Sequence, residues 1–144
     1  MRDQEDIAAI ITRFEQAVLA RDADAVFADY ADDPVAYDLA PPLEIHGMRV
    51  TDHAGLRQWF ATWEGPIRMT SRPSTILVDG DLGVLFTLQN MKGIRKDEGE
   101  VDLWFRCTLA VRRIAGAWKI VHIHTSVPMA IDGSGRAETG LIPD

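Results

Sequence analysis

A long β-hairpin near the carboxyl end constrains the fold of this chain more than any other feature. Its strands are predicted over residues 102–113 and 118–128, and Ile114, Ala115 and Gly116 form the turn between them. Each strand alternates apolar residues with polar or large aromatic residues, a pattern typical of strands whose two faces meet different surroundings. Two strands of this length indicate a curved sheet.

Helices are predicted in the first half of the chain. Apolar residues at three- and four-residue steps predict a helix over residues 3–20. Asp22 caps a shorter second helix that carries Tyr30, and Asp52 caps a third helix that carries Trp63. All of these helices precede the long hairpin.

Strands are predicted for most of the remaining chain. A short pair at 35–38 and 44–46 lies between the second and third helices, and strands with a period of two follow at 75–79 and 82–91. Helices followed by antiparallel strands predict an α+β domain, with three helices packed on one face of a strongly curved antiparallel sheet.

The length of 144 residues is that of one domain. We expect a single domain over residues 1–144, with its core at about 5–128. The tail at 129–144 is rich in Gly, Asp and Ser, and is either mobile or a flap over a neighbouring surface.

The length of the hairpin turn decides which residues share a face. A three-residue turn with Gly116 in the left-handed conformation pairs Arg113 with Ala117 and puts Leu109 opposite Val121. One face of the hairpin is then apolar, and the other is rich in Trp, Arg and His, which suits an interface with a second copy of the chain. The predicted homodimer contacts are Trp104, Arg106, Trp118, His122 and His124. A two-residue turn would instead put the histidines beside Leu109.

Composition excludes several classes of partner. Fifteen basic and 22 acidic residues give a net charge of −7, so we expect neither nucleic acid nor an anionic membrane as a partner. No apolar run approaches the roughly 20 residues of a membrane span, and the charged first residues do not match a signal peptide, so we expect a cytoplasmic protein.

Few residues suggest a metal, a cofactor or a nucleophile. His122 and His124 share a strand face, but no third ligand is placed near them, so we predict no metal site. The chain has no glycine-rich phosphate loop and no Ser/His/Asp signature, so no organic cofactor is expected. The single Cys107 is interpreted as a small buried hydrophobe.

The element order, together with the ending Gly116-Ala-Trp-Lys-Ile-Val-His-Ile-His-Thr-Ser126, resembles the SnoaL-like, ketosteroid-isomerase-like branch of the NTF2-like superfamily. The likeness covers residues 5–128. It implies a conical sheet wrapped by helices, a deep apolar cavity at the open end, and frequent dimerisation through the sheet. Because this superfamily carries many activities on one fold, the resemblance predicts fold more narrowly than function.

The resemblance also implies a catalytic residue. In ketosteroid isomerases a carboxylate in an Asp-Asp…Asp pattern shuttles a proton between carbons, and Asp32-Asp33…Asp38 has that spacing. Desolvation in an apolar mouth raises the pKa of such a carboxyl, so that Asp38 becomes a better base near neutral pH. The positions of the isomerase's two oxyanion donors hold Phe14 and Leu109, which cannot donate a hydrogen bond.

Two functions follow from these observations. The first is a small-molecule enzyme with isomerase-, cyclase- or lyase-like chemistry, in which Asp38 abstracts a proton beside the carbonyl of an apolar substrate. The predicted substrate-binding residues are Phe14, Trp59, Phe60, Trp63, Phe86, Phe105, Leu109 and Ile123. The alternative is a noncatalytic ligand-binding or dimeric assembly module on the same fold, which Phe14 and Leu109 favour.

Overall fold

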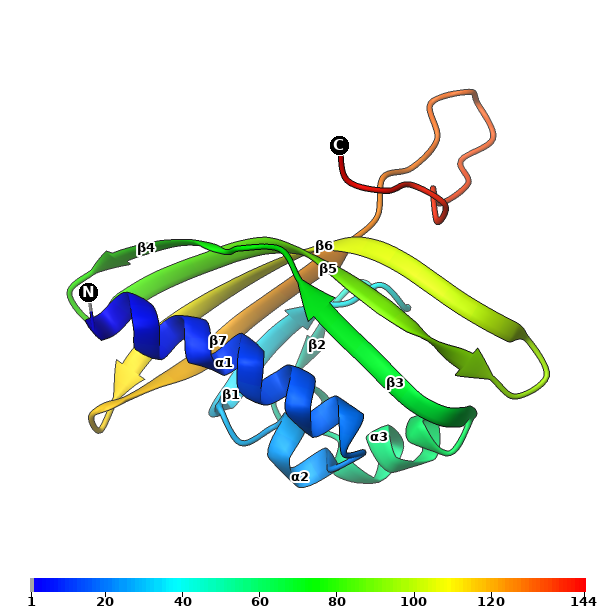
Figure 1. The fold of residues 1–144 in the computed structure, drawn as a ribbon. Coiled ribbons are helices and arrows are strands. Elements are labelled where there is room, and N and C mark those ends of the chain that lie inside the picture. The colour runs from blue at the N-terminus through cyan, green and yellow to red at the C-terminus, as the bar shows by residue number, and fades with distance from the viewer. Residues whose placement is uncertain (1) are drawn as a thin grey trace.

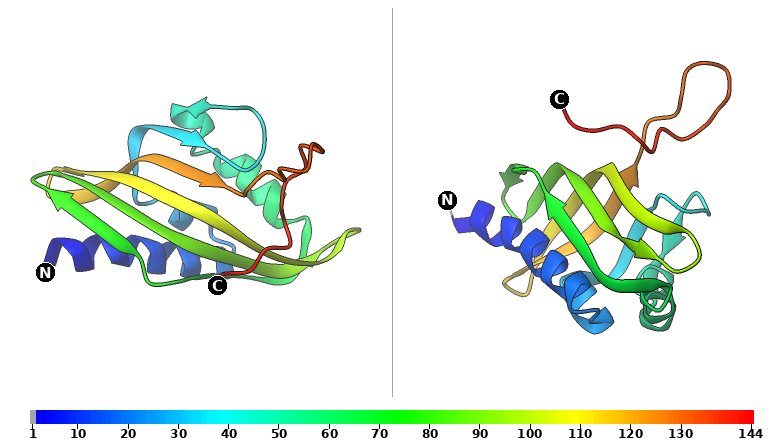
Figure 2. Two further views of the ribbon diagram at one scale, coloured as in Figure 1. Left: turned by 90° about the horizontal axis from the view of Figure 1, so that it is seen from above. Right: turned by 45° about the vertical axis from the view of Figure 1, so that its right-hand side comes forward.

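A strongly curved sheet wraps around the long first helix in the computed structural model, which describes residues 2–144 (Figures 1 and 2). The helices are α1 (Arg2–Leu19), α2 (Ala23–Val26) and α3 (His53–Phe60), with the 3₁₀ turn η1 (Gly47–Arg49) before α3. The strands are β1 (Tyr30–Tyr37), β2 (Ile45–His46), β3 (Trp63–Ser71), β4 (Thr75–Asp79), β5 (Leu82–Arg95), β6 (Gly99–Ile114) and β7 (Ala117–Ser126). Met1, which the predicted domain includes, lies outside the described residues.

The strands form one sheet in the order β2-β1-β7-β6-β5-β3, and β4 also pairs with β5. All pairs are antiparallel except β1 and β7, which run parallel. The predicted α+β architecture is therefore confirmed, but its sheet is mixed. The parallel pair arises because most of the chain lies between β1 and β7, so no tight turn dictates their relative direction.

Three predicted element boundaries differ from the structure. The second helix ends at Val26, and Tyr30 begins β1. The third helix ends at Phe60, so Trp63 begins β3 instead of extending the helix. Residues 92–99, which the sequence pattern leaves outside the predicted strands, are mostly strand, because a tight turn with Asp97 at a φ of 71° lets β5 and β6 continue almost to their junction.

The hairpin turn contains two residues, and the predicted three-residue turn is wrong. Ala115 and Gly116 both have positive φ, at 52° and 82°, which is the geometry of the tight turns that suit a twisted hairpin. Arg113 therefore pairs with Trp118 rather than with Ala117. The Trp118 side chain points into the core and is only 7% exposed.

A β-bulge at Val121 then shifts the pairing by one residue. Leu109 lies opposite Ile123, while His122 lies opposite Ala110 and His124 opposite Thr108. Both histidines thus remain on the outer, convex face, as predicted, although the residues opposite them differ from either expected register.

The core has two parts, both between the sheet and the helices. One part packs the first half of α1, including Ile7 and Ile10, against Leu85 and Leu109 of the sheet. The other joins the end of α1 to α2, α3 and β3, with Trp63 at its centre. Residues of this second part, among them Val18, Val26 and Phe105, also line a cavity.

Candidate functional site

A cavity of about 520 Å³ lies between the concave face of the sheet and the α2–α3 region. Its wall contains residues of α1, α2 and α3, of the segments that follow β1 and β2, and of β3, β5, β6 and β7. Most of its lining side chains are apolar. The lining residues are Phe14, Val18, Val26, Phe27, Tyr30, Ala36, Asp38, Leu39, Ala40, Ile45, Arg49, Val50, Asp52, Leu56, Trp59, Met69, Gln89, Met91, Arg95, Phe105, Ile123 and Thr125.

Asp38 lies at the mouth of this cavity. It follows directly after β1, lines the cavity and is exposed. The surrounding protein still removes part of its water, and this desolvation raises the pKa of the Asp38 carboxyl. A carboxylate with this environment is a stronger proton acceptor than an ordinary surface aspartate.

Tyr30 lies deeper in the same cavity, at the beginning of β1. Burial raises the pKa of the Tyr30 phenol, and the negative charge of Asp38 raises it further. The phenol consequently keeps its proton and serves as a hydrogen-bond donor at any ordinary pH. Asp38 and burial also raise the pKa of the Cys107 thiol to about 12, with burial the larger cause, so this thiol is not a nucleophile.

A second, smaller chamber of about 20 Å³ adjoins the cavity floor. Tyr30 and Gln89 line both spaces, and Cys107 and Leu109 line the chamber. The chamber is about the size of one water molecule. Gln89 is 3% exposed and donates from Nε2 to the Ser71 hydroxyl at 3.2 Å, so its amide is held at the cavity floor.

Five of the eight predicted binding residues line one of the two spaces. Phe14, Trp59, Phe105 and Ile123 line the large cavity, and their role in binding a ligand stays a prediction. Leu109 lines only the small chamber.

Three other predicted lining residues lie outside the cavity wall. Phe60 and Trp63 are buried in the core, at 4% and 1% exposure. Trp63 is there because it begins β3 rather than ending α3. Phe86 is 41% exposed and lies on the convex face, since its neighbour Leu85 points into the core and side chains alternate along a strand.

Sequence reasoning missed six polar residues of the cavity: Tyr30, Arg49, Asp52, Gln89, Arg95 and Thr125. The sequence pattern predicts Tyr30 in a helix, and Gln89 falls on the apolar side of a strand with period two. That position was a usable signal, because a polar residue among inward-facing ones must find a partner or a ligand.

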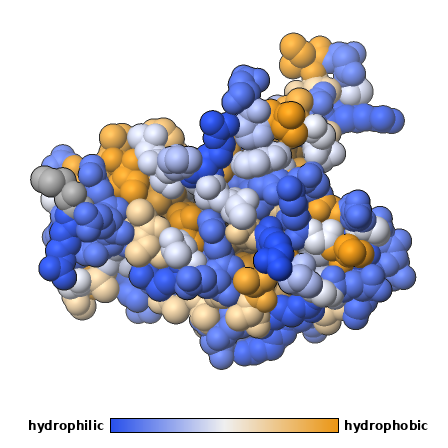
Figure 3. Space-filling model, viewed as in Figure 1, coloured by the Kyte–Doolittle hydropathy of each residue, from blue (hydrophilic) through white to orange (hydrophobic). Residues whose placement is uncertain are grey.

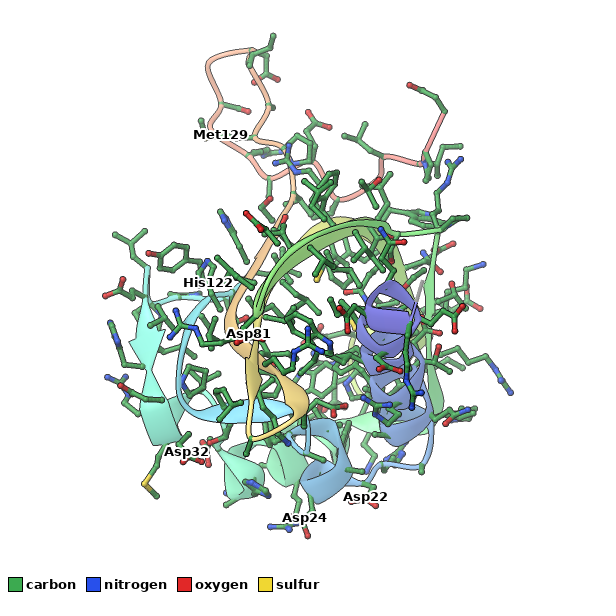
Figure 4. The ribbon with its side chains drawn as sticks, turned by 90° about the vertical axis from the view of Figure 1, so that its left-hand side faces the viewer. Asp22, Asp24, Asp32, Asp81, His122 and Met129 are labelled. Carbon is green, nitrogen blue, oxygen red and sulfur yellow. The ribbon has the colours of Figure 1, made fainter. Side chains whose placement is uncertain are left out.

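Four of the predicted dimer contacts lie on the convex face, but the prediction for Trp118 is wrong, because its side chain is buried in the core on the other side of the sheet. His122 lies on β7 next to β1, on the side of the sheet away from α1 (Figure 4). Its Nδ1 is 2.8 Å from the Val35 carbonyl oxygen, and the Tyr37 ring packs edge-on against both His122 and His124. Arg106 lies opposite Ser126 and donates to its hydroxyl at 3.1 Å.

No group of three or more metal-ligating side chains occurs within residues 2–144. Likewise, no helix of this part of the chain is long and apolar enough to cross a bilayer.

The curved sheet, its helical cover and the cavity at its open end define an NTF2-like domain. Residues 7–130 match the SnoaL-like domain family, and the chain belongs to that family. No curated protein matches the chain.

Solved structures share this fold over nearly the whole chain. An NTF2-like protein of unknown function from Pseudomonas putida KT2440 is 27% identical, with a TM-score of 0.84 over 99% of this chain and 97% of that one. An NTF2-like superfamily protein from Salmonella enterica serovar Typhimurium is 19% identical, with a TM-score of 0.75 over 92% of this chain and 96% of that one. A candidate dehydratase of the NTF2-like family from Streptomyces avermitilis is 18% identical, with a TM-score of 0.74 over 90% and 98%.

Proposed function

We propose that the chain is a small-molecule enzyme that moves a proton at a carbon beside a carbonyl group. One observation carries the proposal: a carboxylate of raised pKa and a protonated phenol line the same largely apolar cavity. Asp38 would remove the proton, and the Tyr30 hydroxyl would donate a hydrogen bond to the enolate oxygen that forms. Asp38 would then return the proton to the substrate.

Tyr30 supplies the function that Phe14 and Leu109 cannot. Both of those side chains are apolar, but the Tyr30 phenol shares their surroundings, since all three line the small chamber beneath the cavity. The two pKa shifts also suit this division of labour. A raised pKa makes Asp38 a better base, and a raised pKa keeps the Tyr30 donor protonated while negative charge develops nearby.

Proton transfer can be tested without knowledge of the natural substrate. In D₂O, the enzyme should exchange the acidic C–H hydrogens of a bicyclic ketone such as 2-tetralone, and NMR would follow the deuterium incorporated. Asp38→Asn should lower the exchange rate by about 10² to 10⁴, and Tyr30→Phe by about 10² to 10³. Asp32→Asn is the control, because Asp32 is exposed on β1 and does not line the cavity. Exchange that survives Asp38→Asn contradicts the proposal.

A noncatalytic ligand-binding or assembly module is the second candidate, and the apolar Phe14 and Leu109 favour it. On this reading the cavity binds an apolar ligand and wild type exchanges no faster than buffer. Ligand binding without exchange in wild type would decide for this candidate.

A further inference from the structure

We infer that the ligand of the large cavity carries a carboxylate on an apolar body, and that Arg95 binds this carboxylate. The inference rests on the proposed ligand cavity and adds the class of molecule that enters it. It starts from Arg95 at the end of β5, which lines the cavity.

Arg95 differs from the other half-buried arginines among residues 2–144. Arg21 donates to the backbone carbonyl oxygens of Phe60, Trp63 and Gly65. Arg113 donates to both carboxylate oxygens of Asp3, at 2.9 and 3.1 Å, and to Asp81 at 3.0 Å. These two guanidinium groups therefore have close oxygen partners.

The Arg95 guanidinium has no such partner. Its Nε is buried without a hydrogen bond, and its nearest carboxylate is that of Glu98, with 3.8 Å between Nη2 and Oε1. The Glu98 side chain is 66% exposed, so water screens this weak pair. In a chain with seven more acidic than basic residues, a cavity arginine without a close carboxylate is best explained by a carboxylate that the ligand brings.

The surroundings of Arg95 also define the body of the ligand. The guanidinium carbon lies 5.2 Å from the centre of the Trp63 ring, which holds the group in place, and the Trp63 ring lies 5.3 Å from that of Trp59. Trp59 lines the cavity together with Met91. An arginine beside a tryptophan and a methionine suits an aromatic or otherwise apolar acid.

Neither carboxylate of the cavity, Asp38 or Asp52, lies within 4.0 Å of the Arg95 guanidinium. Asp52 is bound to the Gly55 amide at 3.0 Å as the cap of α3. Asp38 follows β1, which is separated from β5 by β7 and β6 in the sheet. Three strand spacings amount to about 14 Å along the sheet, so a ligand can bind Arg95 at one end and present its reacting carbon to Asp38 at the other.

The test compares 2-naphthoate with 2-naphthamide, which share an aromatic body and differ in charge. Calorimetric titration of the wild type should give at least about tenfold tighter binding of naphthoate, equal to about 1.4 kcal/mol. Arg95→Gln should abolish this preference. Arg68→Gln is the matched control, since Arg68 is exposed on β3, does not line the cavity, and should keep the preference.

Other outcomes overturn the inference. These are equal affinity of the two probes, no binding of naphthoate at millimolar concentration, or a preference that survives Arg95→Gln. A preference lost only in Arg49→Gln would also overturn it, because Arg49 is the other arginine of the cavity. Far-UV circular dichroism shows whether Arg95→Gln is folded, and Arg95→Lys, which keeps the charge, should retain part of the preference. The binding preference does not depend on Asp38, so failure of proton exchange leaves this result intact.

Discussion

Asp38 and Tyr37 are neighbours in the chain, yet their side chains lie on opposite faces of the sheet. Tyr37 packs on His122 and His124 at the convex face, and Asp38 lines the cavity. Alternation along a strand makes this division predictable from sequence. The position of Tyr30 was not predictable in the same way, because Pro34 indicates a break, whereas β1 continues through it with an irregular register.

The raised pKa of Asp38 predicts a dependence of stability on pH. Below the ordinary value of 3.8 the carboxyl is protonated in both the folded and the unfolded chain. As the pH rises, the unfolded chain ionises first, so the folded state loses stability until its own, higher pKa has been passed. Asp38→Asn should therefore raise the melting temperature at pH 7, and the gain should vanish as the pH falls toward 3.8.

Asp24 provides a control of opposite sign for this experiment. Hydrogen bonding from His53, together with the charge of Arg57, lowers the pKa of Asp24. The ionised Asp24 carboxylate stabilises the folded state at any pH above the ordinary pKa of aspartate. This stabilisation is lost as the pH falls through the lowered pKa of the folded chain. Asp24→Asn should thus lower the melting temperature at pH 7. A melting temperature of Asp38→Asn equal to or below that of wild type at pH 7 would contradict the assigned environment.

The β6–β7 hairpin shows, at the scale of an element, what a sequence pattern leaves open. Its existence and its long strands were predictable from alternation alone. Its register was not predictable. A turn at Ala115-Gly116 requires alanine in the left-handed conformation, which alanine rarely adopts, so the sequence gives no signal for this turn. The bulge at Val121 then moves the pairing by one further residue, which returns the histidines to the outward face. Trp118 lies before the bulge and so enters the core, whereas His122 lies after it and faces outward.

The same turn gives a prediction about stability. An alanine at a φ of 52° is disfavoured relative to asparagine, which tolerates the left-handed region and is common at this place in two-residue turns. Ala115→Asn should stabilise the protein by about 0.5 to 1 kcal/mol, measured by urea unfolding. Ala117→Asn, two residues later in β7, should give no gain, since asparagine is unfavourable within a strand. Equal effects at both positions would show that the turn carries no such strain.

For the whole molecule, the order of helices before strands was enough to predict the α+β class, and the structure confirms it. The contents of the cavity needed the three-dimensional fold, because Tyr30 comes from β1 whereas Gln89 and Arg95 come from β5, far away in the chain. The tail at 129–144 forms no further helix, and its end contacts the loop between β3 and β4, where Arg72 donates to the Asp144 carbonyl oxygen.

Apolar side chains remain uncovered on the single chain. Figure 3 shows apolar groups around the β4 end of the sheet and on the tail. Leu77 of β4 is 59% exposed, Phe86 of β5 41%, and Ile131 of the tail is fully exposed. Leu77 and Phe86 lie on the convex face, as do Trp104 and the two histidines of β7, and they support the prediction that this face binds a second copy of the chain.

If the convex face forms the predicted dimer, substitutions of Phe86 and Trp118, two aromatic residues of one sheet, should have different outcomes. Phe86→Arg places a charge on the exposed convex face, so it should leave the chain folded but convert a dimer of 16.0-kDa chains into monomers, as measured by light scattering at micromolar concentration. Leu19→Arg is the control, because Leu19 is similarly exposed, at 44%, but lies at the end of α1.

Trp118→Arg should instead unfold the chain, since it puts a charge into the core at a cost of about 3 to 5 kcal/mol or more. A folded monomer in wild type, or a dimer that survives Phe86→Arg, would assign the exposed apolar residues to another partner.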